Sequence, residues 1–271
     1  MIDIHSHLLF GLDDGSPDIE TSVAMAEQAI DEGITHMVCT PHANNTHGYQ
    51  PELNRQRLAE LQARLDGRIT LGLGCDFHLS YDNIEDALEN PAKYTINSKD
   101  YLLVEFPDYG ISANIADAFY RMQLKGMLPI ITHPERNPTI NRHPERLAEW
   151  MRCGCLVQVT ASSVTGRFGK TAERFANELL ERNWVHFIAT DAHNLTSRPP
   201  KIREAYQFVA QNYGAETAER LCVTNPRAAF DGGNFPQQPE AIGLDGEDAA
   251  QQFDATGGKG KPGFLSRLFS R

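Results

Sequence analysis

The sequence contains no apolar run near the roughly 18 residues that a membrane-spanning helix needs. Its first residues, MIDIHSHLLF, also lack the basic region and the apolar core of a secretory signal. We therefore expect a cytoplasmic protein. Cysteine is scarce too, with five in 271 residues and no CxxC pair. This pattern predicts neither a disulfide framework nor a structural thiolate metal site.

Positive charge is also in short supply. The chain has 25 Lys and Arg against 36 Asp and Glu, for a formal net charge of −11. Such an acidic excess argues against a protein that holds nucleic acid mainly through surface Lys and Arg. It does not exclude an anionic substrate, because bound metal ions could reverse the charge locally.

The composition changes after residue 231, where Gly, Pro, Gln and Asp replace aliphatic residues. Such a segment cannot bury enough surface to offset its ordering entropy. We predict a folded domain over 1–231 and a low-complexity, disordered tail over 232–271. The tail ends in KGKPGFLSRLFSR, which could contact an anionic membrane or a partner groove. A solvated basic end is the alternative, because the apolar face is only two turns long.

Short apolar runs and amphipathic stretches alternate through the first 231 residues. The expected strands are 2–4, 36–40, 69–72, 101–106, 129–132, 156–160 and 186–190. Most are continuous Val, Ile and Leu runs, as in parallel strands that are buried on both faces. The expected helices are 18–32, 51–66, 112–125, 144–152, 200–213 and 216–222. The alternation predicts an α/β fold, a (βα) barrel of about seven strands.

Histidine and acidic residues follow six of the seven expected strands. In a parallel barrel all carboxyl ends of the strands meet at one mouth, where these folds build active sites. The candidate metal ligands are His5, His7, His42, Asp76, Glu105, His133, Asp191 and His193. Imidazole and carboxylate together suit Zn, Mn or Fe. Eight ligands exceed what one ion takes, so we expect two or three divalent ions with Glu105 or Asp191 as a bridge.

Two metal ions a few ångströms apart can hold a hydroxide and a phosphoryl oxygen together, which fits phosphoester hydrolysis. The expected reaction is an in-line attack on phosphorus by a metal-bound hydroxide, with no phosphoenzyme. A cysteine route would need a thiolate followed six positions later by Arg, and none of the five cysteines has that spacing. The metals would also make the mouth positive inside an acidic protein.

Six motifs in this order, MIDIHSHLLFGLDDGS, TPH, GCDFH, VEFP, THPERN and TDAHN, resemble the PHP (polymerase and histidinol phosphatase) superfamily. More narrowly, they resemble bacterial manganese-dependent protein-tyrosine phosphatases of capsule and exopolysaccharide biosynthesis. The resemblance covers about residues 1–230. It implies a distorted seven-stranded barrel with a trinuclear site, with Mn²⁺ as the expected metal and Fe or Zn as alternatives. It also implies a phosphotyrosine substrate on the tail of a membrane-linked tyrosine autokinase.

The resemblance assigns seven of the eight candidates directly as metal ligands. Asp76 stands where the family commonly has Glu, so this shorter carboxylate either approaches closer or binds weakly, and His78 could assist it. Arg136 and Arg198 lie close to expected ligands in the sequence, and we expect them to hold the phosphate as catalytic residues. For each arginine the alternative is a salt bridge to Glu135 or to a helix acid.

Asp13-Asp14-Gly15-Ser16 lies between the first ligands and the first helix. We interpret Asp14 as a hydrogen-bond partner of a ligating histidine and Ser16 as the cap of the helix.

Three functions compete for this site. The first is a phosphotyrosine phosphatase, and the second is a small-molecule phosphatase of the histidinol-phosphate type. An exonuclease of the same superfamily is a variant of this second function. The acidic net charge disfavours it, since tracking a polynucleotide needs a basic groove. The third is a non-catalytic regulator that binds phosphotyrosine. The sequence leaves the oligomeric state and the physiological substrate open.

Overall fold

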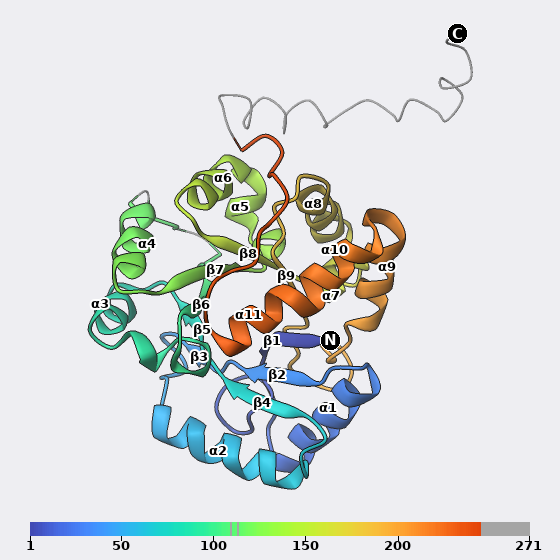
Figure 1. Cartoon of the computed structure of the whole chain (residues 1–271). Helices are drawn as coiled ribbons and strands as arrows, with labels where there is room; N and C mark the ends of the chain where they lie inside the picture. Colours follow the sequence, from blue (N-terminus) through green and yellow to red (C-terminus); the bar gives the residue numbers. More distant parts are fainter. Residues whose placement is uncertain (109, 113, 245–271) are drawn as a thin grey trace.

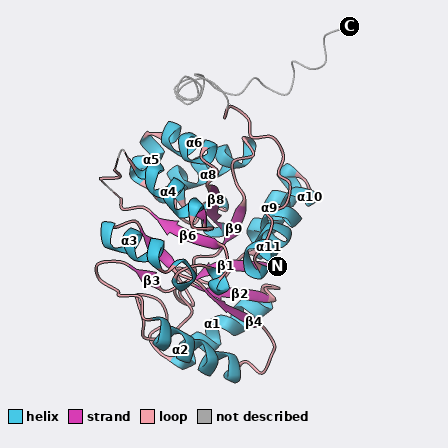
Figure 2. Ribbon diagram, turned by 60° about the vertical axis from the view of Figure 1, so that its left-hand side comes forward, coloured by secondary structure: helices cyan, strands magenta, loops and turns pink. Residues whose placement is uncertain are grey.

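The computed structural model describes residues 1–244 except 109 and 113. Its parallel strands surround one axis and its helices lie outside them (Figures 1 and 2). Two of the strands are interrupted halfway. β2 (His36–Cys39) resumes as β3 (His42–Ala43), and β4 (Thr70–Leu73) resumes as β5 (Asp76–His78). The pairs β2–β4 and β3–β5 are both parallel, so each interrupted strand continues its own ladder.

Uninterrupted strands complete the ring. They are β1 (Ile2–Ser6), β6 (Tyr101–Glu105), β7 (Leu128–Thr132), β8 (Leu156–Thr160) and β9 (Phe187–Ala189). The order runs β1-β2-β4 and β3-β5-β6-β7-β8-β9, and a parallel bridge from Ser6 to Ala192 links the last strand to the first. Counted within the described residues, with β2/β3 and β4/β5 taken as one each, seven strands form the barrel. The predicted α/β barrel is confirmed.

The helices that were expected from the sequence are present, with small shifts at their ends. They are α1 (Ile19–Asp31), α2 (Pro51–Arg64), α4 (Ile115–Leu124), α6 (Pro144–Arg152) and α9 (Arg203–Tyr213). The last expected helix is longer than 216–222. α10 (Ala215–Glu219) continues through the π-helical segment η4 (Arg220–Thr224) into α11 (Asn225–Asp231).

Other helices were not expected. They are α3 (Tyr81–Glu89), α5 (Pro138–Arg142), α7 (Ala161–Val164), α8 (Lys170–Glu181) and the 3₁₀ turns η1 (Pro91–Lys93), η2 (Ile96–Ser98) and η3 (Pro134–Arg136). The structure describes no helix that is both long and apolar enough to span a bilayer.

The cap of α1 differs from the expectation. The Asp18 carboxylate accepts a hydrogen bond from the Thr21 N–H at 2.8 Å and so caps the helix. Ser16 is buried instead, and its hydroxyl accepts a hydrogen bond from Ser22. The prediction that Ser16 caps this helix is therefore wrong, because a cap two residues closer to the helix satisfies its first turn.

The strands separate two apolar clusters, which explains their continuous apolar sequences. In β6, Tyr101 and Leu103 belong to one cluster with Ile2 and Ile4 of β1. The alternate residues, Leu102 and Val104, belong to the larger cluster that includes residues of the outer helices. Successive side chains of a strand point to opposite faces, and here both faces are buried.

Residues 232–244, which we assigned to the disordered tail, contact the barrel at the amino ends of its strands (Figure 1). The Phe235 ring lies 5.5 Å from the ring of Phe187, and the Tyr101 hydroxyl donates to the Gly233 carbonyl at 2.8 Å. Further along, the Trp184 indole donates to the Ile242 carbonyl at 3.0 Å. The expectation from composition does not hold for these residues, because barrel side chains bind the backbone carbonyls of this segment. Residues 245–271, with the basic end, lie outside the described residues.

We expect Phe235→Ala to lower the free energy of unfolding by about 1–3 kcal/mol, less than the roughly 3–5 kcal/mol of a fully buried Phe. The side chain is half-buried, and it packs far from the mouth of the barrel. Urea denaturation would measure the loss. Ile242→Ala is the control, since its side chain is 56% exposed. An equal loss in both variants would contradict a specific role for Phe235.

Candidate functional site

All eight predicted ligands gather at the carboxyl ends of the strands. The structure forms four overlapping groups there, and within each group the possible ligand atoms lie within 4.8 Å of one another. The groups are His7, Asp14, His42 and His193; His5, His7 and Asp76; His5, His133 and Asp191; and His42, Asp76 and Glu105. Residues that are up to 188 positions apart thus form one cluster, as the barrel topology requires.

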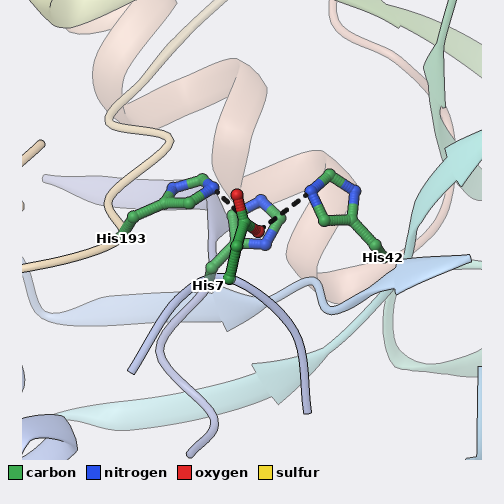
Figure 3. Close-up of side chains that lie close together, drawn as sticks. His7, His42 and His193 are labelled. Carbon is green, nitrogen blue, oxygen red and sulfur yellow. Dashed lines mark ion pairs between the residues drawn. The ribbon is translucent and has the colours of Figure 1, made fainter. Parts of the chain in front are cut away.

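Asp14 is the member of this cluster that the sequence did not identify as a ligand. Figure 3 shows His7, His42 and His193 drawn together around one carboxylate. The Asp14 Oδ1 atom lies 3.4 Å from His42 Nε2 and 3.6 Å from His193 Nε2. The hydrogen-bonding role that we expected of Asp14 belongs to its neighbour Asp13, which accepts from His7 Nδ1 at 2.8 Å.

Several atoms of the cluster are buried and have no hydrogen-bond partner among the described residues. They are His5 Nε2, His7 Nε2, His42 Nδ1 and both carboxylate oxygens of Asp76. The Asp76 Oδ2 atom lies 3.3 Å from His42 Nδ1 and 3.4 Å from His5 Nε2. Ligands at about 2.0–2.2 Å from a shared ion lie roughly 3–3.5 Å apart, so this spacing fits metal ions. Unpaired buried groups are otherwise costly.

Asp76 reaches the cluster despite its short side chain, whereas His78 belongs to none of the groups that the described residues form. The expectation that His78 could assist Asp76 therefore has no geometric support. Asp76 lies in β5, which pairs directly with β3 and β6. That position brings its carboxylate between ligands of both neighbouring strands, His42 and Glu105.

Hydrogen bonds orient three of the histidines. The Nδ1 atoms of His5, His7 and His193 donate to Gln158 Oε1, Asp13 Oδ2 and the Asp191 carbonyl, at 2.9, 2.8 and 2.9 Å. Each bond fixes the tautomer and leaves Nε2 free to bind an ion. The sequence does not reveal the role of Gln158, because its partner His5 lies in a different strand, 153 positions away in the chain.

The backbone is strained at two members of the cluster. His133 and Asp191 have φ angles of 34° and 52°, in the left-handed region that residues other than glycine rarely adopt. Such strain costs about 1–3 kcal/mol per residue and tends to occur at functional sites. Here hydrogen bonds to neighbouring strands stabilise the strained backbone. The His133 N–H donates to the Gln158 carbonyl, and the Asp191 N–H donates to the His5 carbonyl.

Arg136 and Arg198 converge on Asp191. Each donates a hydrogen bond from Nη2 to the Asp191 Oδ2 atom, while Oδ1 lies 3.4 Å from the Nε2 atoms of His5 and His7. Among the described residues neither arginine forms the alternative ion pair with Glu135. The Glu135 Oε1 atom instead accepts from the Thr160 N–H and the Ser163 hydroxyl.

The acids of the cluster respond differently to burial. Burial and the neighbouring charges of Asp76 and Asp191 raise the pKa of Glu105 to about 9. Burial also opposes the ionisation of Asp191, but Arg136, His5 and Arg198 outweigh it and hold the Asp191 pKa well below its ordinary value. The Glu105 carboxyl thus stays protonated near neutral pH unless a further cation lies beside it. Divalent ions would supply the missing charge.

Gly15 allows the loop to fold back against His7. A Cβ atom at this position would lie 2.2 Å from the His7 carbonyl oxygen and 2.5 Å from its Cβ, closer than atoms can approach. The Ser16 N–H also donates to that carbonyl at 3.1 Å. Only glycine therefore fits between His7 and the acids of the loop.

We expect Gly15→Ala to displace His7, to lower the bound metal and to reduce kcat/KM by about a hundredfold, the effect typical of a 1 Å misplacement. Metal analysis and steady-state kinetics would measure both. Gly48→Ala is a matched control, because a Cβ atom there meets nothing within 4 Å. Similar behaviour of the two variants would show that the contact with His7 does not matter.

The thiols are poorly placed for catalysis. Four of the five cysteines are buried, and burial raises the pKa of Cys222 to about 12 and that of Cys75 well above its ordinary value. No cysteine belongs to the metal-ligand groups of the described residues. A thiolate nucleophile therefore has no support from the structure.

Several known proteins are similar to this chain in sequence and in fold. The sequence model of the family "Capsular polysaccharide synthesis, CpsB/CapC" matches residues 1–231. The tyrosine-protein phosphatase YwqE of Bacillus subtilis is 36% identical over 246 residues, which cover 89% of this chain and 96% of YwqE. CpsB of Streptococcus pneumoniae, also a tyrosine-protein phosphatase, is 32% identical over 236 residues. The matched region covers 84% of this chain and 97% of CpsB.

A solved structure agrees. Crystal structures are known of YwqE from Bacillus subtilis and CpsB from Streptococcus pneumoniae, described as metal-dependent tyrosine phosphatases. The matching chain superposes with a TM-score of 0.83 at 33% identity, over 89% of this chain and 99% of that one. The resemblance seen in the sequence motifs is confirmed: the chain belongs to the CpsB/CapC family of capsular polysaccharide synthesis.

Proposed function

We propose that this protein is a metal-dependent protein-tyrosine phosphatase. The observation that carries the proposal is the buried cluster of histidines and carboxylates, whose unpartnered atoms face one another beside two arginines. The named activity of the relatives at 30–36% identity supports it. We assign the activity to residues 1–231, the span of the family match.

The ligands of the ions would be the eight predicted residues together with Asp14. Bound ions activate water as a nucleophile and polarise the phosphoryl group. Imidazole and carboxylate ligands suit Mn, Fe and Zn. We propose two or three Mn²⁺ ions, the metal that the resemblance of the motifs implies, with Fe and Zn as alternatives. The hydrogen bonds of Asp13 and Gln158 keep His7 and His5 in the tautomer that ligation needs.

Arg136 and Arg198 would act on the substrate. Asp191 holds the Nη2 atom of each, and the Nη1 atoms of the two planar guanidinium groups would hold phosphoryl oxygens. Because the arginines are fixed before the substrate arrives, they stabilise the charge of the transition state without reorganising. The pair also orients the phosphorus for in-line attack, and the phenolate leaves from the opposite side.

The substrate would be phosphotyrosine on a membrane-linked tyrosine autokinase of capsule or exopolysaccharide synthesis, met in the cytoplasm. The family description, which names capsular polysaccharide synthesis, supports this assignment. A comparison of kcat/KM for a phosphotyrosine peptide, histidinol phosphate and a short oligonucleotide would test it. We expect the peptide to be the best substrate by far. A preference for histidinol phosphate would favour the small-molecule alternative, and binding without turnover would indicate a regulator.

A further inference from the structure

A pocket of about 410 Å³ opens beside the cluster, between α5 and the start of α8. Arg136 and Asn141 form one side, and Phe168 and Thr171 form the other, with the buried Glu135 also in its wall. Its volume is that of a small ligand site. None of the predicted metal ligands lines this pocket, so metal binding does not account for it.

Arg136 connects this pocket to the cluster. One end of its guanidinium donates to Asp191, and its Cζ atom lies 4.8 Å from the centre of the Phe168 ring. One side chain thus borders both the proposed phosphate position and the pocket. A substrate longer than a single phosphorylated residue can extend from the first into the second.

The polar atoms of the pocket indicate what it binds. Asn141, Arg142 and Thr171 line it with at least part of their surface exposed. Arg136 borders the pocket as well, and Phe168 and Ala172 add apolar surface. A peptide segment brings main-chain donors and acceptors together with apolar side-chain atoms, so it matches this mixed lining. A purely apolar ligand would leave the polar groups of the lining unpaired.

We propose that this pocket is the subsite for the peptide segment next to the phosphotyrosine. It would make the enzyme favour phosphoproteins over small aryl phosphates. The inference rests on the proposed phosphatase function and adds a substrate-selecting site to it.

Thr171→Trp tests the proposal by filling the pocket. Thr171 is exposed at the start of α8 and lies outside the catalytic cluster. We expect kcat/KM for a phosphotyrosine peptide to fall about tenfold, while turnover of p-nitrophenyl phosphate changes less than about twofold. Gln211→Trp, a neutral and exposed position on α9, is the control and should leave both rates unchanged.

A second measurement does not depend on turnover of the peptide. A phosphonate analogue of the peptide should inhibit hydrolysis of p-nitrophenyl phosphate by the wild-type protein, and about tenfold less in Thr171→Trp. Equal inhibition of both proteins, or an equal loss of both activities in the variant, would overturn the subsite. Wild-type protein that hydrolyses neither substrate would instead overturn the phosphatase function itself.

Discussion

Dialysis against a chelator should abolish the phosphatase activity, and added Mn²⁺ should restore it. We expect a fall of about three orders of magnitude in kcat, because several kcal/mol of transition-state stabilisation depend on bound ions. The residues that remain cannot replace them. Without cations, burial and the neighbouring carboxylates raise the Glu105 pKa to about 9, and the His5 and His7 Nε2 atoms stay unpartnered.

Cysteine alkylation serves as the control for this experiment. Cys153 is the one exposed thiol of the five, and it lies outside the cluster, so alkylation should leave the rate unchanged. Parallel metal analysis should give two or three ions per chain in active protein and fewer after chelation. Activity that survives chelation and disappears on alkylation would refute a metal mechanism in favour of a thiolate.

The position of the site was predictable because it follows from topology. Parallel strands bring their carboxyl ends to one mouth, so a histidine or acid after each strand has few other places to lie. The same logic could not separate Asp13 from Asp14. Their roles depend on the path of the loop that Gly15 lets fold against His7, and this path is set by a contact rather than by spacing.

The missed parts of the fold have physical reasons as well. α8 begins after Gly169 with no side-chain cap and no proline, although its buried residues Ala172, Phe175, Ala176, Leu179 and Leu180 follow the helical period. Composition also could not predict that residues 232–244 pack on the barrel. Their attachment relies on Phe235 and on side-chain donors from elsewhere in the chain.

Net charge alone would have given the wrong view of the substrate. A formal charge of −11 suggests that the protein repels phosphate. The structure instead places Arg136 and Arg198 together at the mouth, with one carboxylate between them. Local geometry, and the ions that the cluster fits, thus decide which anions can enter.

Asp191→Asn should lower kcat/KM by about three orders of magnitude and reduce the bound metal, with the fold intact. Asparagine has the same shape and accepts the left-handed backbone that Asp191 adopts at φ 52°. The variant therefore removes charge rather than structure. The charge matters twice, since Oδ1 faces the unpartnered Nε2 atoms of His5 and His7, and Oδ2 holds both arginines.

Asp18→Asn is the matched control, because Asp18 is an exposed helix cap and asparagine caps about as well. Both variants should melt close to the wild-type temperature when metal is present in excess. Only Asp191→Asn should lose metal and rate, and excess Mn²⁺ should restore occupancy more fully than turnover. The remaining deficit would measure the arginines, which have lost the carboxylate that fixes them for the phosphate. Normal turnover in Asp191→Asn would remove Asp191 from the site, because neither the ions nor the arginines would then depend on its charge.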